Sequence, residues 1–141
     1  MSMVQQVIDR LKATPGVRQV QGAVELAAAI SATTVATPTL FVVPMRNSAG
    51  RDQGFTGDVT QQVQSALAIV FVVDNKRDAT GAAAINDLEP LRIAVRKQLL
   101  GWAPPGMDAP FTTSGGQLID MVSGRVWWGD DYLIDQLWSS E

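Results

Sequence analysis

Apolar residues recur at helical spacing near the start of the chain. The spacing predicts a helix over residues 4–11, with Ser2 placed as its N-cap and with Pro15 and Gly16 ending it. An alanine-rich stretch from Glu25 to Ile30 favours a second helix, because alanine has the highest intrinsic helix propensity.

A longer helical stripe follows the middle of the chain, over residues 80–100. Its apolar members are three or four residues apart: Ala84, Leu88, Leu91, Val95 and Leu99. Asp78 or Thr80 is placed to cap the start, and Gly101 is placed to stop the helix. Pro90 interrupts the stripe, so the segment is predicted either to bend or to consist of two helices.

Alternating apolar and polar positions predict strands in the rest of the chain. The segment from Gln61 to Val73 is the clearest, and one end of it is apolar on both faces, as in a strand buried on both sides. Further strands are predicted over residues 17–23, 39–43, 109–113, 117–122 and 125–128. The Ser-Gly-Gly and Ser-Gly segments are predicted as turns between the last three, and residues 130–138 fit a strand or a short helix.

The segment from Arg46 to Asp58 has three glycines and little apolar material, which predicts a long mobile loop. Loops of this length often carry function, although an ordinary hairpin loop remains the alternative.

The order of these elements predicts an α+β fold. We expect a mixed, largely antiparallel β-sheet with the helices packed on one face, and one domain over residues 1–141.

Composition narrows the classes of function. The chain has 141 residues, a net charge of -3, and neither cysteine nor histidine, which excludes disulfides, thiolate zinc sites and histidine-dependent triads. The negative charge argues against a module that grips DNA. No signal segment or membrane span is recognisable, so we expect synthesis in the cytoplasm, no membrane contact and no cofactor.

Two groups of residues are candidates for function. Asp130, Asp131 and Asp135 fit a solvated turn or, less well, a metal-dependent enzyme, because neighbouring residues on a strand point apart. For the same reason Trp127 and Trp128 are predicted on opposite faces of a strand. The ring that lies outside the core needs either a covering segment of the same chain or a subunit interface.

The chain from Val73 to Tyr132 resembles bacteriophage tail terminator proteins of the Mu-like prophage type. The resemblance is carried by N-x-R-D after a strand, D-L-x-x-L-R in the helix, and then L-L-G-W-x-P, G-G-x-L and W-W. None of these motifs is catalytic.

The resemblance implies a structural α+β subunit that assembles as a ring, usually a hexamer, in the virion. Such a ring caps the tail tube, stops its polymerisation and offers a docking surface to the head-tail connector protein, while DNA passes through its lumen. The implied partners are copies of the chain, the tail tube protein and the connector. Candidate interface residues are Arg46, Asn47, Arg51, Phe55, Trp127 and Trp128. The alternatives are another neck or head-completion protein, or the metal-dependent enzyme.

Overall fold

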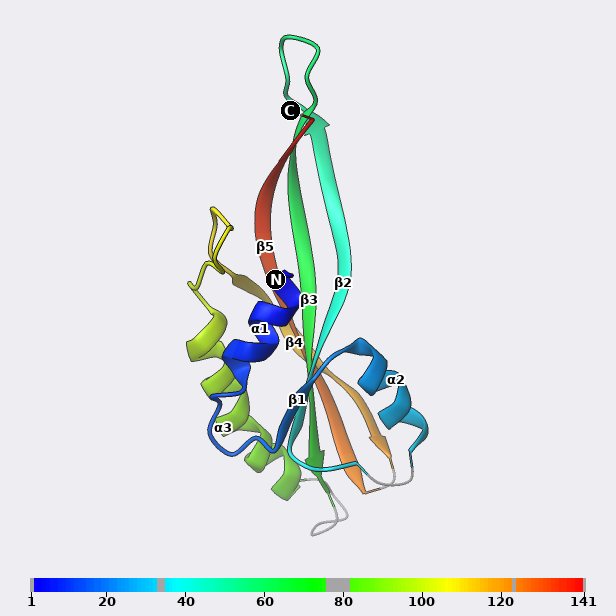
Figure 1. Ribbon diagram of the computed structural model, residues 1–141. Helices are drawn as coiled ribbons and strands as arrows, with labels where there is room; N and C mark the ends of the chain where they lie inside the picture. The colour runs from blue at the N-terminus through cyan, green and yellow to red at the C-terminus, as the bar shows by residue number, and fades with distance from the viewer. Residues whose placement is uncertain (1, 33–34, 76–81, 123, 141) are drawn as a thin grey trace.

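The computed structural model describes residues 2–32, 35–75, 82–122 and 124–140, and its centre is one five-stranded sheet (Figure 1). The strand order is β1-β2-β3-β5-β4, with β1 parallel to β2 and every other pair antiparallel. The strands are β1 (Gln19–Gln21), β2 (Thr39–Asp52), β3 (Thr60–Asp74), β4 (Thr112–Val122) and β5 (Arg125–Ser139). The predicted α+β class and the mixed, mostly antiparallel sheet are confirmed.

The three helices of the described chain lie on both faces of this sheet. They are α1 (Met3–Leu11), α2 (Ala23–Ser31) and α3 (Ala82–Leu99). The helices α1 and α3 pack side by side on one face, whereas α2 covers the opposite face (Figure 1). The expected placement of all helices on one face is therefore corrected. None of the described helices is long and apolar enough to span a membrane.

The two-sided cover follows from the sequence of β3. Leu67, Ile69 and Phe71 point into the core under α1 and α3. Ala68 and Val70, on the other side of the same strand, pack in a second core under α2. Since both faces of this half of the strand are apolar, each needs a helix to exclude water.

The other half of the sheet is a ribbon of β2, β3 and β5 that extends beyond the helices (Figure 1). Here the predicted loop from Arg46 to Asp58 is too long, because β2 continues to Asp52 and pairs with β3 as far as Asp52 opposite Gln61. Only residues 53–58 of the predicted segment form the hairpin loop. Every residue of β2 from Pro44 onwards is exposed. A strand with both faces in water needs no apolar alternation, so its sequence looks like a loop.

The C-terminal hairpin also has fewer breaks than its sequence indicates. Gly115 has a positive φ of 100° and sits at a bulge within β4, so the Ser-Gly-Gly segment bends one continuous strand and the predicted turn is absent there. Residues 130–138 belong to β5, which confirms the strand alternative.

The helix α3 is a single helix from Ala82 to Leu99 that contains Pro90. Its predicted caps, Asp78 and Thr80, lie outside the described residues. At the other end Gly101 has the positive φ predicted for a helix stop, 81°. The short N-terminal helix is confirmed with its cap, because the Ser2 hydroxyl accepts the backbone N–H of Gln5 at 3.1 Å.

Trp102 follows the end of α3 and contacts both α1 and the segment before β4. Truncation of its side chain tests this packing directly. Its ring stacks on Phe111 at 6.2 Å, and the Arg10 guanidinium lies 4.3 Å from the ring centre. We expect Trp102→Ala to lower the free energy of unfolding by about 2–3 kcal/mol, less than for a fully buried tryptophan. Chemical denaturation measures this loss of stability. The control is Trp138→Ala, which truncates an exposed tryptophan and should cost about 1 kcal/mol or less. Unchanged stability with altered assembly would instead make Trp102 an interface residue.

Candidate assembly interface

The neighbouring tryptophans of β5 point to opposite faces, as predicted. Trp127 is 6 % exposed and packs in the core under α2, with the Arg125 guanidinium 6.0 Å from its ring centre. Trp128 is half-buried against the other core, and the Arg92 guanidinium lies 4.6 Å from its ring centre. Both rings therefore find cover within their own chain, and a role in a subunit interface stays a prediction for the exposed part of Trp128.

Asp130 is the centre of a buried polar cluster that the sequence did not reveal. Its carboxylate accepts two hydrogen bonds from the guanidinium of Arg92, at 2.9 and 3.0 Å, and a third from the Trp128 indole at 2.9 Å. These bonds raise the pKa of Arg92 above its ordinary value. Burial raises the pKa of the adjacent Tyr132 phenol to about 12, so that side chain stays neutral. The cluster ties α3 to β5.

The carboxylates proposed as a metal site are not gathered together. Asp130 pairs with Ile69 in the sheet register, whereas Asp131 pairs with Ala68, whose side chain belongs to the opposite core. Asp135 instead accepts a hydrogen bond from Gln64 at 3.4 Å. Within the described ranges, no three acidic side chains are placed to hold a metal ion. The arrangement of these aspartates therefore gives the enzyme alternative no support.

The remaining candidate residues lie on the projecting β2–β3 hairpin. Arg46 and Arg51 are exposed on β2 and make no ion pair with another described residue. Asn47 is anchored, because its amide oxygen accepts the Ser65 hydroxyl at 2.7 Å. Phe55 is fully exposed in the turn, at 100 %. Because aromatic side chains are enriched at protein interfaces, Phe55 remains a candidate contact residue.

The hairpin turn is held by Asp52, and this gives a prediction about pH. Its carboxylate accepts the backbone N–H groups of Thr60 and Gly54, both at 2.9 Å, which lowers its pKa below the ordinary value. A lowered pKa adds stability above the unfolded-state pKa, and that stability is lost as the pH falls through the folded-state pKa. We expect an NMR titration to give Asp52 a midpoint below that of an aspartate in an unfolded chain. Asp52→Asn should loosen the turn at neutral pH, and an ordinary midpoint would contradict the two hydrogen bonds.

A second exposed surface lies along β4, which forms one border of the sheet. Leu118, Ile119, Met121 and Val122 are 40–53 % exposed, although they are large and apolar. They form two adjacent pairs, so they fall on both faces of the strand. The sequence does carry a signal for this surface, because two neighbouring apolar residues on a strand place one side chain on each face. The sequence analysis used these residues only to predict a strand.

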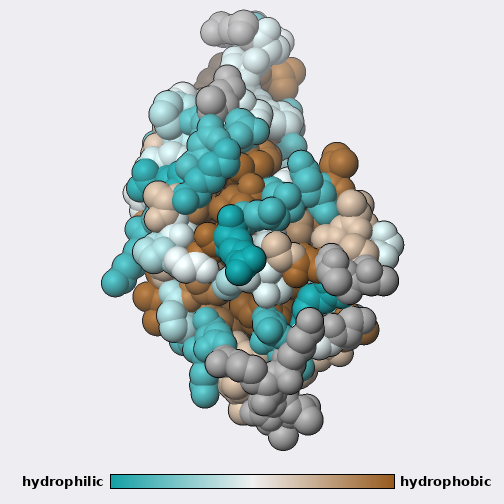
Figure 2. Space-filling view, turned by 60° about the horizontal axis from the view of Figure 1, so that its bottom comes forward, coloured by the Kyte–Doolittle hydropathy of each residue, from teal (hydrophilic) through white to brown (hydrophobic). Residues whose placement is uncertain are grey.

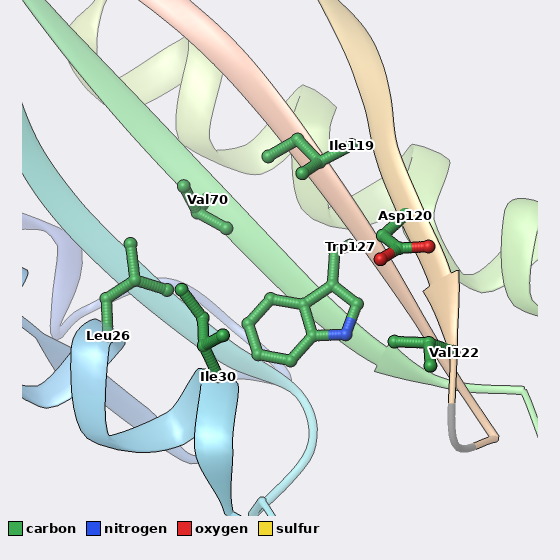
Figure 3. A pocket seen from close by; sticks show the side chains of 7 residues that line it. All are labelled: Leu26, Ile30, Val70, Ile119, Asp120, Val122 and Trp127. Carbon is green, nitrogen blue, oxygen red and sulfur yellow. The ribbon is translucent and has the colours of Figure 1, made fainter.

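An apolar pocket of about 400 Å³ opens between β4 and α2. Its lining, shown in Figure 3, consists of Leu26, Ile30, Val70, Ile119, Asp120, Val122 and Trp127. The surface around α2 is also apolar, with Val24 82 % and Ile30 68 % exposed, and Figure 2 shows brown and tan atoms on that side. Exposed apolar surface of this kind marks a protein contact site.

The described part of the structure thus presents two separate exposed surfaces, an apolar one on β4 and α2 and a polar one on the β2–β3 hairpin, as expected for a subunit of an assembly. A family model described as phage tail terminator protein matches residues 1–139, so the chain belongs to the phage tail terminator family. It is a structural protein of the bacteriophage virion that acts in tail assembly. The narrower resemblance to the Mu-like type stays a prediction. A search of curated proteins gave no match.

Proposed function

We propose that copies of this chain form a closed ring, of six subunits as the resemblance implies, on the last ring of the tail tube. The ring stops polymerisation of the tube and gives the head-tail connector its docking surface, and DNA passes through the lumen without specific binding. Assembly takes place in the host cytoplasm.

The observation that carries this proposal is the presence of two unlike contact surfaces on one subunit. Neighbours in a ring meet head to tail, so each subunit needs two different and complementary patches. One patch is the apolar surface of β4 and α2, which contains the pocket. The other is the polar β2 side of the hairpin, which carries Arg46 and Arg51.

The polar ribbon also suits contact with a neighbouring component of the tail. It extends beyond the layer of helices (Figure 1), and residues 53–57 of its turn are exposed. A projecting element of this kind reaches a partner without moving the body of the subunit. We therefore assign the turn around Phe55 to contact with the tube protein.

A phage that lacks the gene, complemented with variants, tests the proposal. The uncomplemented phage should make overlong or headless tails, and normal joined tails would reject the tail-capping function. The Phe55→Ser variant should fold normally, because the fully exposed phenyl group makes no packing contact that could be lost. It should nevertheless give fewer completed tails. The control is Ile93→Ser on α3, a 39 % exposed apolar residue that belongs to neither surface, which should complement fully. Normal tails with Phe55→Ser would reject the assignment of the turn.

A further inference from the structure

We propose that the sheet continues from subunit to subunit, because the outer edge of β4 in one copy pairs antiparallel with the outer edge of β2 in the next. This inference rests on the proposed ring and specifies how its subunits join. The β4 edge is defined here as Gln117–Val122, and the β2 edge as Met45–Asp52.

In the single subunit, neither edge pairs with a further described strand. β4 is the last strand of the sheet, and all its residues are exposed. On the other side, β1 pairs with β2 only at Thr39, Leu40 and Phe41, so the rest of β2 has no described strand outside it. A free edge presents unpaired N–H and C=O groups, which are a template for another strand. The two free edges lie on opposite sides of one sheet, as head-to-tail neighbours require.

Strand direction also fits. β2 is antiparallel to β3, β3 to β5, and β5 to β4, so β4 runs opposite to β2. Rotation about a ring axis keeps the direction of each strand relative to that axis. A β4 strand placed beside the β2 strand of the next copy is therefore antiparallel to it, which permits a regular ladder.

The side chains of the two edges are complementary in charge. The β2 edge carries Arg46 and Arg51, which have no ion-pair partner within the described chain. The only acid of this edge, Asp52, is already bonded to the backbone of the hairpin turn. The β4 edge carries no cation and one acid, Asp120, whose carboxylate accepts a hydrogen bond from the backbone N–H of Met121 at 2.8 Å. Pairing also covers the apolar residues of β4 and brings Met45, 59 % exposed, out of water.

The offset between the edges suits a closed barrel. β4 lies beside β5 from Arg125 to Leu133, whereas the β2 edge is level with the other end of β5, through β3. Strands that join with an offset must tilt relative to the ring axis, and a closed sheet requires this tilt. Each strand also contains two bulges or irregularities, which curve a sheet as closure demands.

Amide hydrogen exchange tests the pairing without knowledge of its register. Light scattering first defines a dilute monomer and a concentrated ring, and exchange is then compared over both edges. We expect the amides of both edges to exchange more slowly in the ring, while exposed positions near Ile85 and Ile93 on α3 do not change.

Three other results would contradict the inference. Slower exchange at the β4 edge alone would overturn it in favour of a two-fold contact between β4 strands. A ring in which both edges still exchange fast would overturn it and leave the ring intact. A chain with no ring in solution or at the top of the tail would reject the proposed function as well.

Engineered disulfides provide a second measurement, because the natural chain has no cysteine. Cysteine replaces Gln117, Leu118 or Asp120 on β4, combined with cysteine at Asn47, Ser48 or Ala49 on β2. A disulfide needs Cα atoms about 4.4–6.8 Å apart, so only positions that face each other cross-link. Double variants should oxidise to a ladder that ends in a closed covalent ring, and single variants should stay uncross-linked. Covalent dimers from a single β4 variant would contradict the pairing, and Ile85→Cys with Ile93→Cys is the control for random collision.

Discussion

Arg92→Leu is expected to lower the free energy of unfolding by about 3–5 kcal/mol at neutral pH. The side chain of Asp130 is only 5 % exposed and accepts two hydrogen bonds from the Arg92 guanidinium. Without Arg92, this carboxylate stays buried. Of the donors found in the described structure, it then keeps only the Trp128 indole. A buried charge without its partner costs far more than the intact pair contributes. Chemical denaturation of the monomer measures the loss.

A double-mutant cycle separates this cause from simple loss of packing. Arg92→Leu with Asp130→Asn should cost clearly less than the sum of the two single changes, because the second change removes the stranded charge. Arg96→Leu, on the same helix, is the matched control and should cost about 1 kcal/mol or less, since Arg96 makes no ion pair with another described residue. Additive costs in the cycle would show that Arg92 acts by packing alone.

Gly116→Val is expected to cost about 3 kcal/mol or more. A Cβ at this position would overlap the Asp130 carboxylate, and it would lie 2.7 Å from the Gly129 carbonyl oxygen and 2.8 Å from the Trp128 indole nitrogen. These groups form the buried cluster itself, so β4 must move away from β5 or the ion pair must open.

The measurement for Gly116 is again denaturation, with Gln117→Val as the control. Gln117 is the next residue of β4 and is exposed, so valine there should change stability by about 0.5 kcal/mol or less. In Gly116→Val the near-ultraviolet signal of the tryptophans should change as well, because Trp128 is displaced. Wild-type stability of the Gly116→Val variant would show that β4 does not pack closely against the buried cluster.

Much of the fold could be predicted where side chains alternate against a core. The β3 pattern predicted a strand buried on both sides at one end, and the adjacent tryptophans predicted opposite faces; the structure confirms both. The same β3 pattern also indicates that a helix covers the second face of the sheet, because an apolar face must be shielded from water. That consequence was missed because the helices were assigned to one face.

The site was less predictable, for physical reasons. Arg92 and Asp130 are 38 residues apart, and no local periodicity reports a contact between a helix and a distant strand. The ribbon part of β2 has both faces in water, so its strand carries no apolar signal. Exposure of the β4 edge depends on strand order, which the sequence pattern alone does not fix.

The ribbon beyond the helices has a consequence for how such a protein diversifies. Few of its side chains are buried, so most substitutions there cost the subunit little stability. The body, by contrast, is constrained by two cores and a buried ion pair. Selection can therefore retune the ribbon to a changed neighbour in the virion while the scaffold that presents it stays the same.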